Sequence, residues 1–175
     1  MSYEERENGM IANQQGHTIR GRMLQPGDDA PDFRMEALDN TFKTLADYGN
    51  KIKLVSVVPS VPTRVCSMQT HRFNAEASKM DEDVVILTVS ADLPMALRRW
   101  CGAEGIDRLE MLSTHRDMQF LDDYGVHDLD WRINQRSIFV IDRDNKIIYA
   151  EYIPVIGEEV NYEAALDAVR EALGK

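Results

Sequence analysis

Cysteine is scarce in this sequence. Only Cys66 and Cys101 occur among 175 residues, and no Cys-x-x-Cys pair exists, because Gln69 stands where a second cysteine would complete one. The histidines are dispersed, at His17, His71, His115 and His127. Structural zinc sites need four ligands at short spacings, so this distribution argues against a metal site. It leaves dithiol redox chemistry open.

Positive charge and long apolar runs are also lacking. Lys and Arg total 20 against 30 Asp and Glu, which gives a formal net charge of −10. Nucleic-acid and anionic-membrane surfaces need clustered positive charge, so we expect neither partner. No stretch reaches the 18 or so apolar residues of a membrane span, and the acidic start is unlike a signal peptide. We expect a cytoplasmic protein.

The rest of the composition is ordinary, with 43% apolar and 29% charged residues. Residues 1–16 are polar and weakly patterned, and we expect a flexible N-terminal segment there. Residues 17–175 form one predicted domain, since no linker or repeat divides them. A short hairpin is predicted near residues 17–24, turning at Gly21.

Strands and helices alternate through the middle of the chain. Apolar β-branched runs predict buried strands over residues 51–58 and 83–90, with a helix between them that ends near residue 80. A short helix follows, with Pro94 in its first turn and Gly102 closing it. A helix that ends at Gly102 would place Cys101 in its frayed last turn.

The patterns after residue 105 predict a strand over residues 108–113, a helix over 117–124 and an irregular loop over 127–135. A hairpin of two strands over 136–142 and 146–153 follows, and a final helix over 161–173. Alternating units form a parallel sheet, and the hairpin adds antiparallel strands. The predicted fold class is therefore α/β, a mixed central sheet with helices on both faces.

The stretch around Cys66 carries the chemistry. Pro59 and Pro62 end the preceding strand, which places Cys66 in the first turn of the next helix. Unpaired N–H groups and the helix dipole favour a negative charge there, and such sites lower a thiol pKa from about 8.5 to as low as roughly 3.5. The position indicates a nucleophile. An inert core cysteine is the alternative, because free cysteine is commonly buried.

Pro59-x-x-x-Thr63-x-x-Cys66 resembles the active-site motif of peroxiredoxins, and more narrowly of their thiol peroxidase subfamily. Supporting stretches follow in order: SADLP at 90–94, WCGAEG at 100–105, LST at 112–114, RSIFVID at 136–142 and NYEAAL at 161–166. The resemblance spans roughly residues 25–173. The resemblance implies a thioredoxin-like fold with an N-terminal β-hairpin extension.

The resemblance also implies a role for each matched residue. Cys66 would be the peroxidatic cysteine that attacks a hydroperoxide, and Cys101 the resolving cysteine that closes an intramolecular disulfide. Thr63 would orient the peroxide, Pro59 would shield the pocket, and Arg136 would contact the cysteine. Thioredoxin or a similar dithiol protein would recycle the disulfide. A homodimer is expected, and no cofactor or metal.

Other readings of these residues stay open. Thr63 could cap the helix as well as serve catalysis, Cys101 could be structural, and Arg136 at a strand start would ordinarily be a solvated charge. Pro62 and Arg64 depart from the aspartate and glycine usual in the subfamily motif, which bears on pocket shape and substrate preference.

Two other functions are alternatives to a peroxidase. One is a peroxide-sensing switch or binding module without sustained turnover. The other is a cysteine hydrolase, which needs a general base beside Cys66. His71 is five positions along the predicted helix and turned away from Cys66, so the hydrolase is the weaker alternative.

Overall fold

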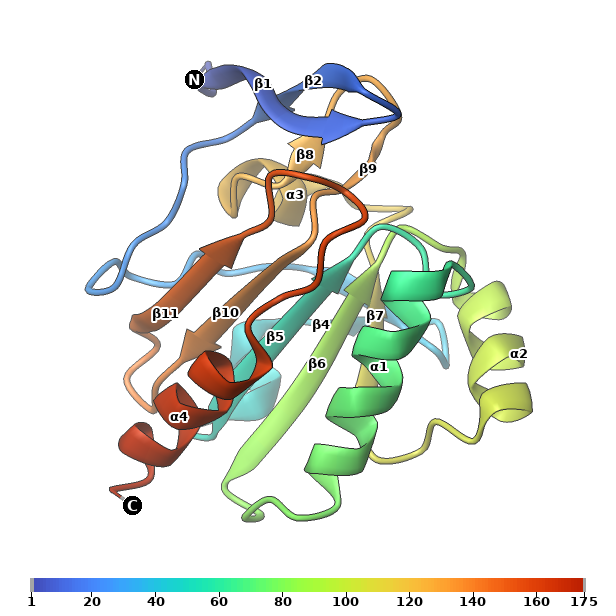
Figure 1. Cartoon of the computed structure of the whole chain (residues 1–175). Coiled ribbons are helices and arrows are strands. Elements are labelled where there is room, and N and C mark those ends of the chain that lie inside the picture. Colours follow the sequence, from blue (N-terminus) through green and yellow to red (C-terminus); the bar gives the residue numbers. More distant parts are fainter. Residues whose placement is uncertain (1, 175) are drawn as a thin grey trace.

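A seven-stranded mixed sheet forms the centre of the computed structural model, which describes residues 2–174 (Figure 1). Its strand order is β11-β10-β5-β6-β7-β3-β4, and β5, β6 and β7 run parallel. The bounds are β3 (Met35–Ala37), β4 (Phe42–Lys43), β5 (Ile52–Val58), β6 (Val84–Ser90), β7 (Glu110–Ser113), β10 (Ser137–Ile141) and β11 (Ile147–Tyr152). The mixed sheet predicted from the sequence is therefore confirmed.

Helices cover both faces of this sheet. They are η1 (Leu45–Tyr48), α1 (Arg64–Ala77), α2 (Pro94–Glu104), α3 (Gln119–Asp123) and α4 (Tyr162–Ala172). Figure 1 shows α1 and α4 on one face, where Phe73 and Leu166 pack against Leu54. Val55 and Val57 point to the other face and its separate core. Because both faces are covered, every residue of β5 is buried.

An N-terminal hairpin is present, but not where the sequence predicted it. Strands β1 (Glu5–Ala12) and β2 (Gln15–Arg20) pair antiparallel, so the segment expected to be flexible holds regular structure from Glu5. The turn uses Asn13 and Gln14, both with positive φ, at 49° and 66°. The sequence signal was weak because such turns usually carry glycine.

The segment predicted as an irregular loop contributes two short strands. β8 (His127–Asp128) and β9 (Ile133–Asn134) extend the β1–β2 hairpin into a four-stranded sheet. They could not be predicted from periodicity, because each has two residues.

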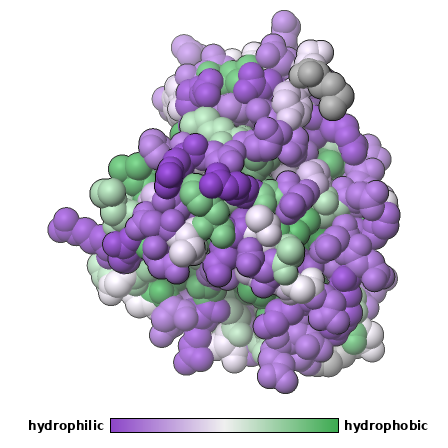
Figure 2. Space-filling model, turned by 180° about the vertical axis from the view of Figure 1, so that it is seen from behind, coloured by the Kyte–Doolittle hydropathy of each residue, from purple (hydrophilic) through white to green (hydrophobic). Residues whose placement is uncertain are grey.

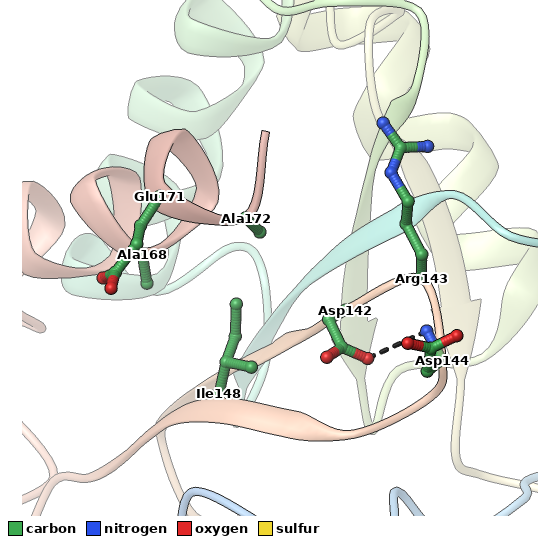
Figure 3. A pocket seen from close by; sticks show the side chains of 7 residues that line it. All are labelled: Asp142, Arg143, Asp144, Ile148, Ala168, Glu171 and Ala172. Carbon is green, nitrogen blue, oxygen red and sulfur yellow. Dashed lines mark hydrogen bonds between the residues drawn. The ribbon is translucent and has the colours of Figure 1, made fainter. Parts of the chain in front are cut away.

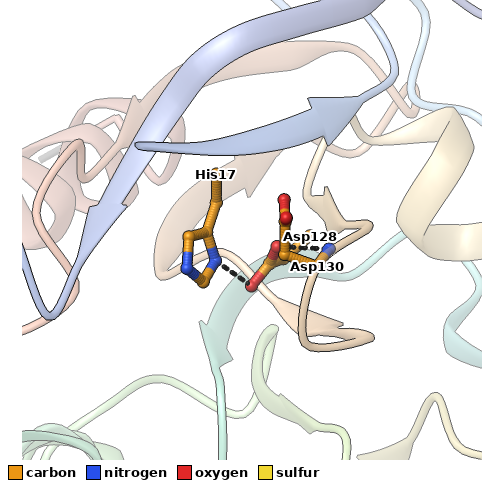
Figure 4. Close-up of side chains that lie close together, drawn as sticks. All are labelled: His17, Asp128 and Asp130. Atoms are coloured by element: carbon orange, nitrogen blue, oxygen red, sulfur yellow. Dashed lines mark hydrogen bonds and ion pairs between the residues drawn. The ribbon is translucent and has the colours of Figure 1, made fainter. Parts of the chain in front are cut away.

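A buried polar contact joins the hairpin to β8. His17 Nδ1 lies 2.9 Å from Asp128 Oδ2 (Figure 4). Asp130 accepts the Thr18 amide at 2.8 Å. Ligand atoms of His17, Asp128 and Asp130 lie within 4.8 Å of one another, as in a metal site. Hydrogen bonds within the cluster explain that closeness, and they fasten the hairpin to β8 and to the turn after it within the smaller sheet.

Helix α2 ends later than predicted. Gly105, with a φ of 70°, forms its C-cap, while Gly102 lies within the helix. Glycine takes this left-handed conformation without strain, and the Gly105 amide donates back to the Cys101 carbonyl. Cys101 is therefore inside the helix and not at its frayed end.

The helices and the surface of the molecule carry no long apolar stretch of helix among the described residues. No helix of residues 2–174 is long and apolar enough to span a bilayer. Figure 2 shows a face dominated by hydrophilic residues, with hydrophobic residues scattered between them. Singly exposed apolar residues of this kind are normal for a protein surface.

Candidate active site

The carboxyl end of β5 leads directly into the candidate site. Pro59 is buried behind the strand, and residues 60–63 form a turn in which the Thr63 amide donates to the Ser60 carbonyl at 3.3 Å. Helix α1 starts at Arg64, so Cys66 is its third residue. The Cys66 side chain is 1% exposed. The predicted first-turn position is thus the observed one.

Arg136 meets Cys66 because of the sheet register. Strand β10 runs antiparallel to β5, and Ser137 pairs with Val57, so the residue before β10 lies beside the end of β5. Arg136 is 2% exposed, and its Nη2 lies 3.5 Å from Cys66 Sγ. It is not the solvated charge that its position at a strand start suggested.

Two neutral acceptors hold the Arg136 guanidinium in place. Nη1 donates to Gln69 Oε1 at 3.0 Å, and Nη2 donates to the Ile156 carbonyl at 3.0 Å. Gln69 is fixed in turn, because its Nε2 donates to Ser56 Oγ at 2.8 Å. The arginine is therefore oriented from α1, β5 and the loop before α4.

No carboxylate in residues 2–174 forms an ion pair with Arg136, and its Nε has no hydrogen-bond partner there. A buried charge is costly unless an opposite charge or hydrogen bonds compensate it. The Cys66 sulfur is the group in contact that could supply negative charge. Arg136 and the amide groups of the first helical turn are therefore the hydrogen-bond donors that surround the sulfur.

Thr63 lies at the exposed edge of the site. Its hydroxyl donates to the Ser60 carbonyl at 2.9 Å. Thr63 occupies the N-cap position of α1, as the sequence allowed, but its side chain makes no capping hydrogen bond. Because the Thr63 hydroxyl donates its hydrogen to the Ser60 carbonyl, the hydroxyl oxygen can accept a hydrogen bond from another group.

Cys101 faces the same apolar cluster as Cys66. Both are free thiols, and Cys101 is 6% exposed on the inner face of α2. Burial raises the pKa of Cys101 to about 11. The cluster also contains Val58, Val61, Leu97, Ile106 and Met111. The structure thus brings both cysteines into one apolar region without a bond between them.

His71 does not serve as a base for Cys66. Its side chain is exposed, 3.1 Å from Glu104 Oε2, and its ring packs edge-on against Trp100. This contact confirms the orientation away from Cys66 that the helical spacing predicted.

A hollow of about 320 Å³ lies elsewhere, at the other end of the sheet. Figure 3 shows it between the β10–β11 turn and α4, where the Asp144 amide donates to Asp142. Its lining is mixed in charge and includes Arg143 and Glu171. No residue that contacts Cys66 or Arg136 belongs to it, so it is not part of this site.

The Redoxin family model matches residues 25–166, which include the turn, α1, α2 and Arg136. The chain belongs to the Redoxin family. Two relatives of this Redoxin protein narrow the assignment. It is 46% identical over 153 residues to the thiol peroxidase of Bacillus subtilis (strain 168), covering 87% of this chain and 91% of the relative. The thiol peroxidase of Streptococcus pneumoniae (strain R6) is 48% identical over 153 residues, covering 87% and 93%.

Solved structures agree with these sequence relatives. A peroxiredoxin-like protein from Aquifex aeolicus superimposes with a TM-score of 0.86 at 29% identity, over 98% of this chain and 99% of that one. A thiol peroxidase from Chromobacterium violaceum has a TM-score of 0.83 at 18% identity, over 94% and 97%, and supports the fold. The predicted thioredoxin-like fold and thiol peroxidase membership are confirmed.

Some residues around this Redoxin site were not predicted. Gln69 lies on the buried face of α1 with Phe73, and a polar residue on an apolar helical face is a signal that could have found it. Asn134 donates to the Val58 and Val89 carbonyls, so it joins the ends of β5 and β6. Asp92 binds the 60–63 turn. Neither Asn134 nor Asp92 stands near Cys66 in the sequence.

Proposed function

We propose that this protein is a thiol-dependent peroxidase that reduces hydrogen peroxide and alkyl hydroperoxides. The observation that carries the proposal is the buried Cys66 thiol in the first turn of α1, 3.5 Å from a buried arginine that has no carboxylate partner among the described residues. Membership of the thiol peroxidase group supports the same reaction.

In the first step, the Cys66 thiolate attacks the terminal oxygen of the peroxide. The O–O bond breaks, and its electron pair leaves with the distal oxygen, which takes a proton to become water or an alcohol. Arg136 and amides of the turn and first helical turn face the developing negative charge. The Thr63 hydroxyl donates to the Ser60 carbonyl, so its oxygen accepts a hydrogen bond from the peroxide O–H. Cys66 is left as a sulfenic acid.

In the second step, Cys101 attacks the Cys66 sulfur. A disulfide forms, and the sulfenic oxygen leaves as water. Burial keeps Cys101 protonated at neutral pH, since its pKa is about 11. Because only a thiolate attacks well, we infer that α2 opens locally and brings Cys101 into a more polar setting before this step.

A dithiol protein such as thioredoxin then reduces the disulfide by exchange. Because both cysteines must return to the thiol form after each cycle, the reaction is suited to a reducing compartment such as the cytoplasm. The homodimer implied by the resemblance stays a prediction. A measurement of the molar mass in solution tests it. Pro59, buried behind the strand end, is assigned the shielding of the pocket.

The test is steady-state peroxide consumption with thioredoxin and its reductase. Wild-type protein should sustain turnover, Cys66→Ser should have none, and Cys101→Ser should consume one peroxide per chain and then stall. One turnover by wild-type protein without recycling would contradict a peroxidase and would match a peroxide-sensing switch instead.

A further inference from the structure

Asp92 connects two loops at the carboxyl end of the sheet. It lies half-buried between β6 and α2. Its Oδ1 accepts Ser60 Oγ at 2.7 Å, and its Oδ2 accepts the Val61 amide at 2.9 Å and the Ser90 hydroxyl. Its own carbonyl accepts Ser113 Oγ at 2.6 Å. Donors from three strand ends therefore converge on one residue.

The parallel pairing of β5 and β6 explains why these loops meet. Val58 is paired with Ser90, so both strands end at the same level. The chain then turns into residues 59–63 on one side and 91–93 on the other. The Ala91 amide donates to the Pro59 carbonyl at 3.4 Å, which gives a second bond between the loops.

The Asp92 bonds reach Thr63 through Ser60. The Ser60 side chain is held by Asp92, while the Ser60 carbonyl accepts both the amide and the hydroxyl of Thr63, at 3.3 and 2.9 Å. The direction of the Thr63 hydroxyl therefore depends on how Ser60 is held. Thr63 is followed three positions later by Cys66, whose own bonds to Arg136 do not involve Asp92.

We propose that Asp92 is a positioning residue for peroxide reduction: its carboxylate fixes the 60–63 turn so that Thr63 and the turn amides meet the peroxide at Cys66. This inference rests on the proposed peroxidase function. It separates two requirements of the site, because Arg136 acts on the sulfur and Asp92 acts on the place where the peroxide binds.

The role needs a carboxylate and not merely a polar side chain. Three donors approach its two oxygens, whereas asparagine has one acceptor oxygen and would turn an N–H₂ group toward other donors. Asp92→Asn should therefore lower the peroxide rate constant of Cys66 only in part, and Asp92→Ala should lower it most.

The experiment compares two reactions of Cys66 in a Cys101→Ser background, where Cys66 is the single thiol. Second-order rate constants are measured with hydrogen peroxide and with iodoacetamide. Iodoacetamide alkylates the thiolate but needs no peroxide pocket, so it reports the sulfur alone. Melting temperatures of all variants report folding.

We expect Asp92→Ala to lower the peroxide rate constant by about 10- to 100-fold, as small displacements of positioning groups do. The iodoacetamide rate constant should stay within about twofold. Asp142→Ala is the matched control: Asp142 is also half-buried and accepts two main-chain amides, from Asp144 and Lys146, but at the opposite end of the sheet. It should change neither reaction.

An unchanged peroxide rate, or an equal loss in both reactions, would overturn the positioning role. If Asp92→Ala does not fold, Ser60→Ala decides, because it removes one bond and should lower the peroxide rate alone. A parent protein that reacts with peroxide no faster than free cysteine would instead overturn the peroxidase function, and the role of Asp92 with it.

Discussion

At the scale of single residues, Arg136 is the most informative. A lone arginine at a strand start gave no signal of burial, and only resemblance assigned it to the site. The structure buries it because the antiparallel register of β10 and β5 places it beside the Cys66 turn. There Gln69 and a main-chain carbonyl accept hydrogen bonds from its guanidinium. A cation held by neutral acceptors favours an anion beside it.

Replacing Arg136 by glutamine should lower the rate constant of Cys66 with hydrogen peroxide by about 100- to 1000-fold, because a donor to the reacting sulfur and the leaving oxygen is lost. Stopped-flow kinetics measure it. Arg64→Gln is the control: Arg64 is nearer in sequence but exposed, and its side chain makes no ion pair or hydrogen bond within residues 2–174. Equal losses in both variants would contradict a specific role for Arg136.

Gln69 supports Arg136, and its removal should appear as lost stability. Gln69→Leu leaves Ser56 and one Arg136 nitrogen without their partner in the core, so we expect the free energy of unfolding to fall by about 1–3 kcal/mol. Urea denaturation measures this change. Gln15→Leu, at an exposed position whose side chain makes no hydrogen bond within residues 2–174, should cost less than about 0.5 kcal/mol. A neutral Gln69→Leu would show that water replaces the amide.

At the scale of elements, strong periodicity predicted most of the fold. The strands β5 and β6 and the capped helix α4 were predicted to within a few residues, because long apolar patterns and a clear cap mark them. The N-terminal hairpin was misplaced because its turn lacks glycine. The end of α2 was misplaced because two glycines compete, and only packing decides between Gly102 and Gly105.

Helix α2 is tied to the turn between β3 and β4, and this contact should slow disulfide formation. Arg98 donates from Nε to the Leu38 carbonyl at 3.0 Å and from Nη2 to Asn40 Oδ1 at 3.1 Å. If α2 must open to expose Cys101, Arg98→Ala should speed the step from sulfenic acid to disulfide by about 2- to 10-fold. Tryptophan fluorescence after a peroxide pulse follows this step.

Arg99→Ala provides the matched control for that measurement. Arg99 is the next residue on α2, and its exposed side chain makes no hydrogen bond or ion pair in the described part of the chain. Its removal should leave the rate unchanged. A rate equally unchanged in Arg98→Ala would show that opening of α2 at this end does not limit the reaction.

At the scale of the whole molecule, topology assembles the site from distant segments. Cys66 follows β5, Asp92 follows β6, and Arg136 precedes β10, yet all lie at one end of the sheet. Sequence patterns predicted the strands and the pairing of β10 with β11 in a hairpin, but not the order of the other strands or the register of any pair. Resemblance supplied the roles of the site residues, and the structure adds the contacts that support them.

Burial of Cys101 should make stability depend on pH. Its pKa is about 11 in the folded protein against 9.0 as reference, so the unfolded chain loses this proton first. The unfolded state then binds fewer protons, and stability falls as pH rises from 9 to 11. Relative to Cys101→Ser, reduced wild-type protein should lose about 1–2 kcal/mol across this range in urea denaturation. Parallel curves would contradict a buried neutral thiol.

Counting thiols after a single oxidation tests the central claim most directly. Reduced protein, freed of reductant, receives one equivalent of hydrogen peroxide and is then alkylated and weighed as an intact chain. The account predicts that Cys66 and Cys101 are both lost to alkylation within one chain, with no intermolecular disulfide. Two thiols still open to alkylation, or Cys66 oxidised while Cys101 stays free, would contradict it.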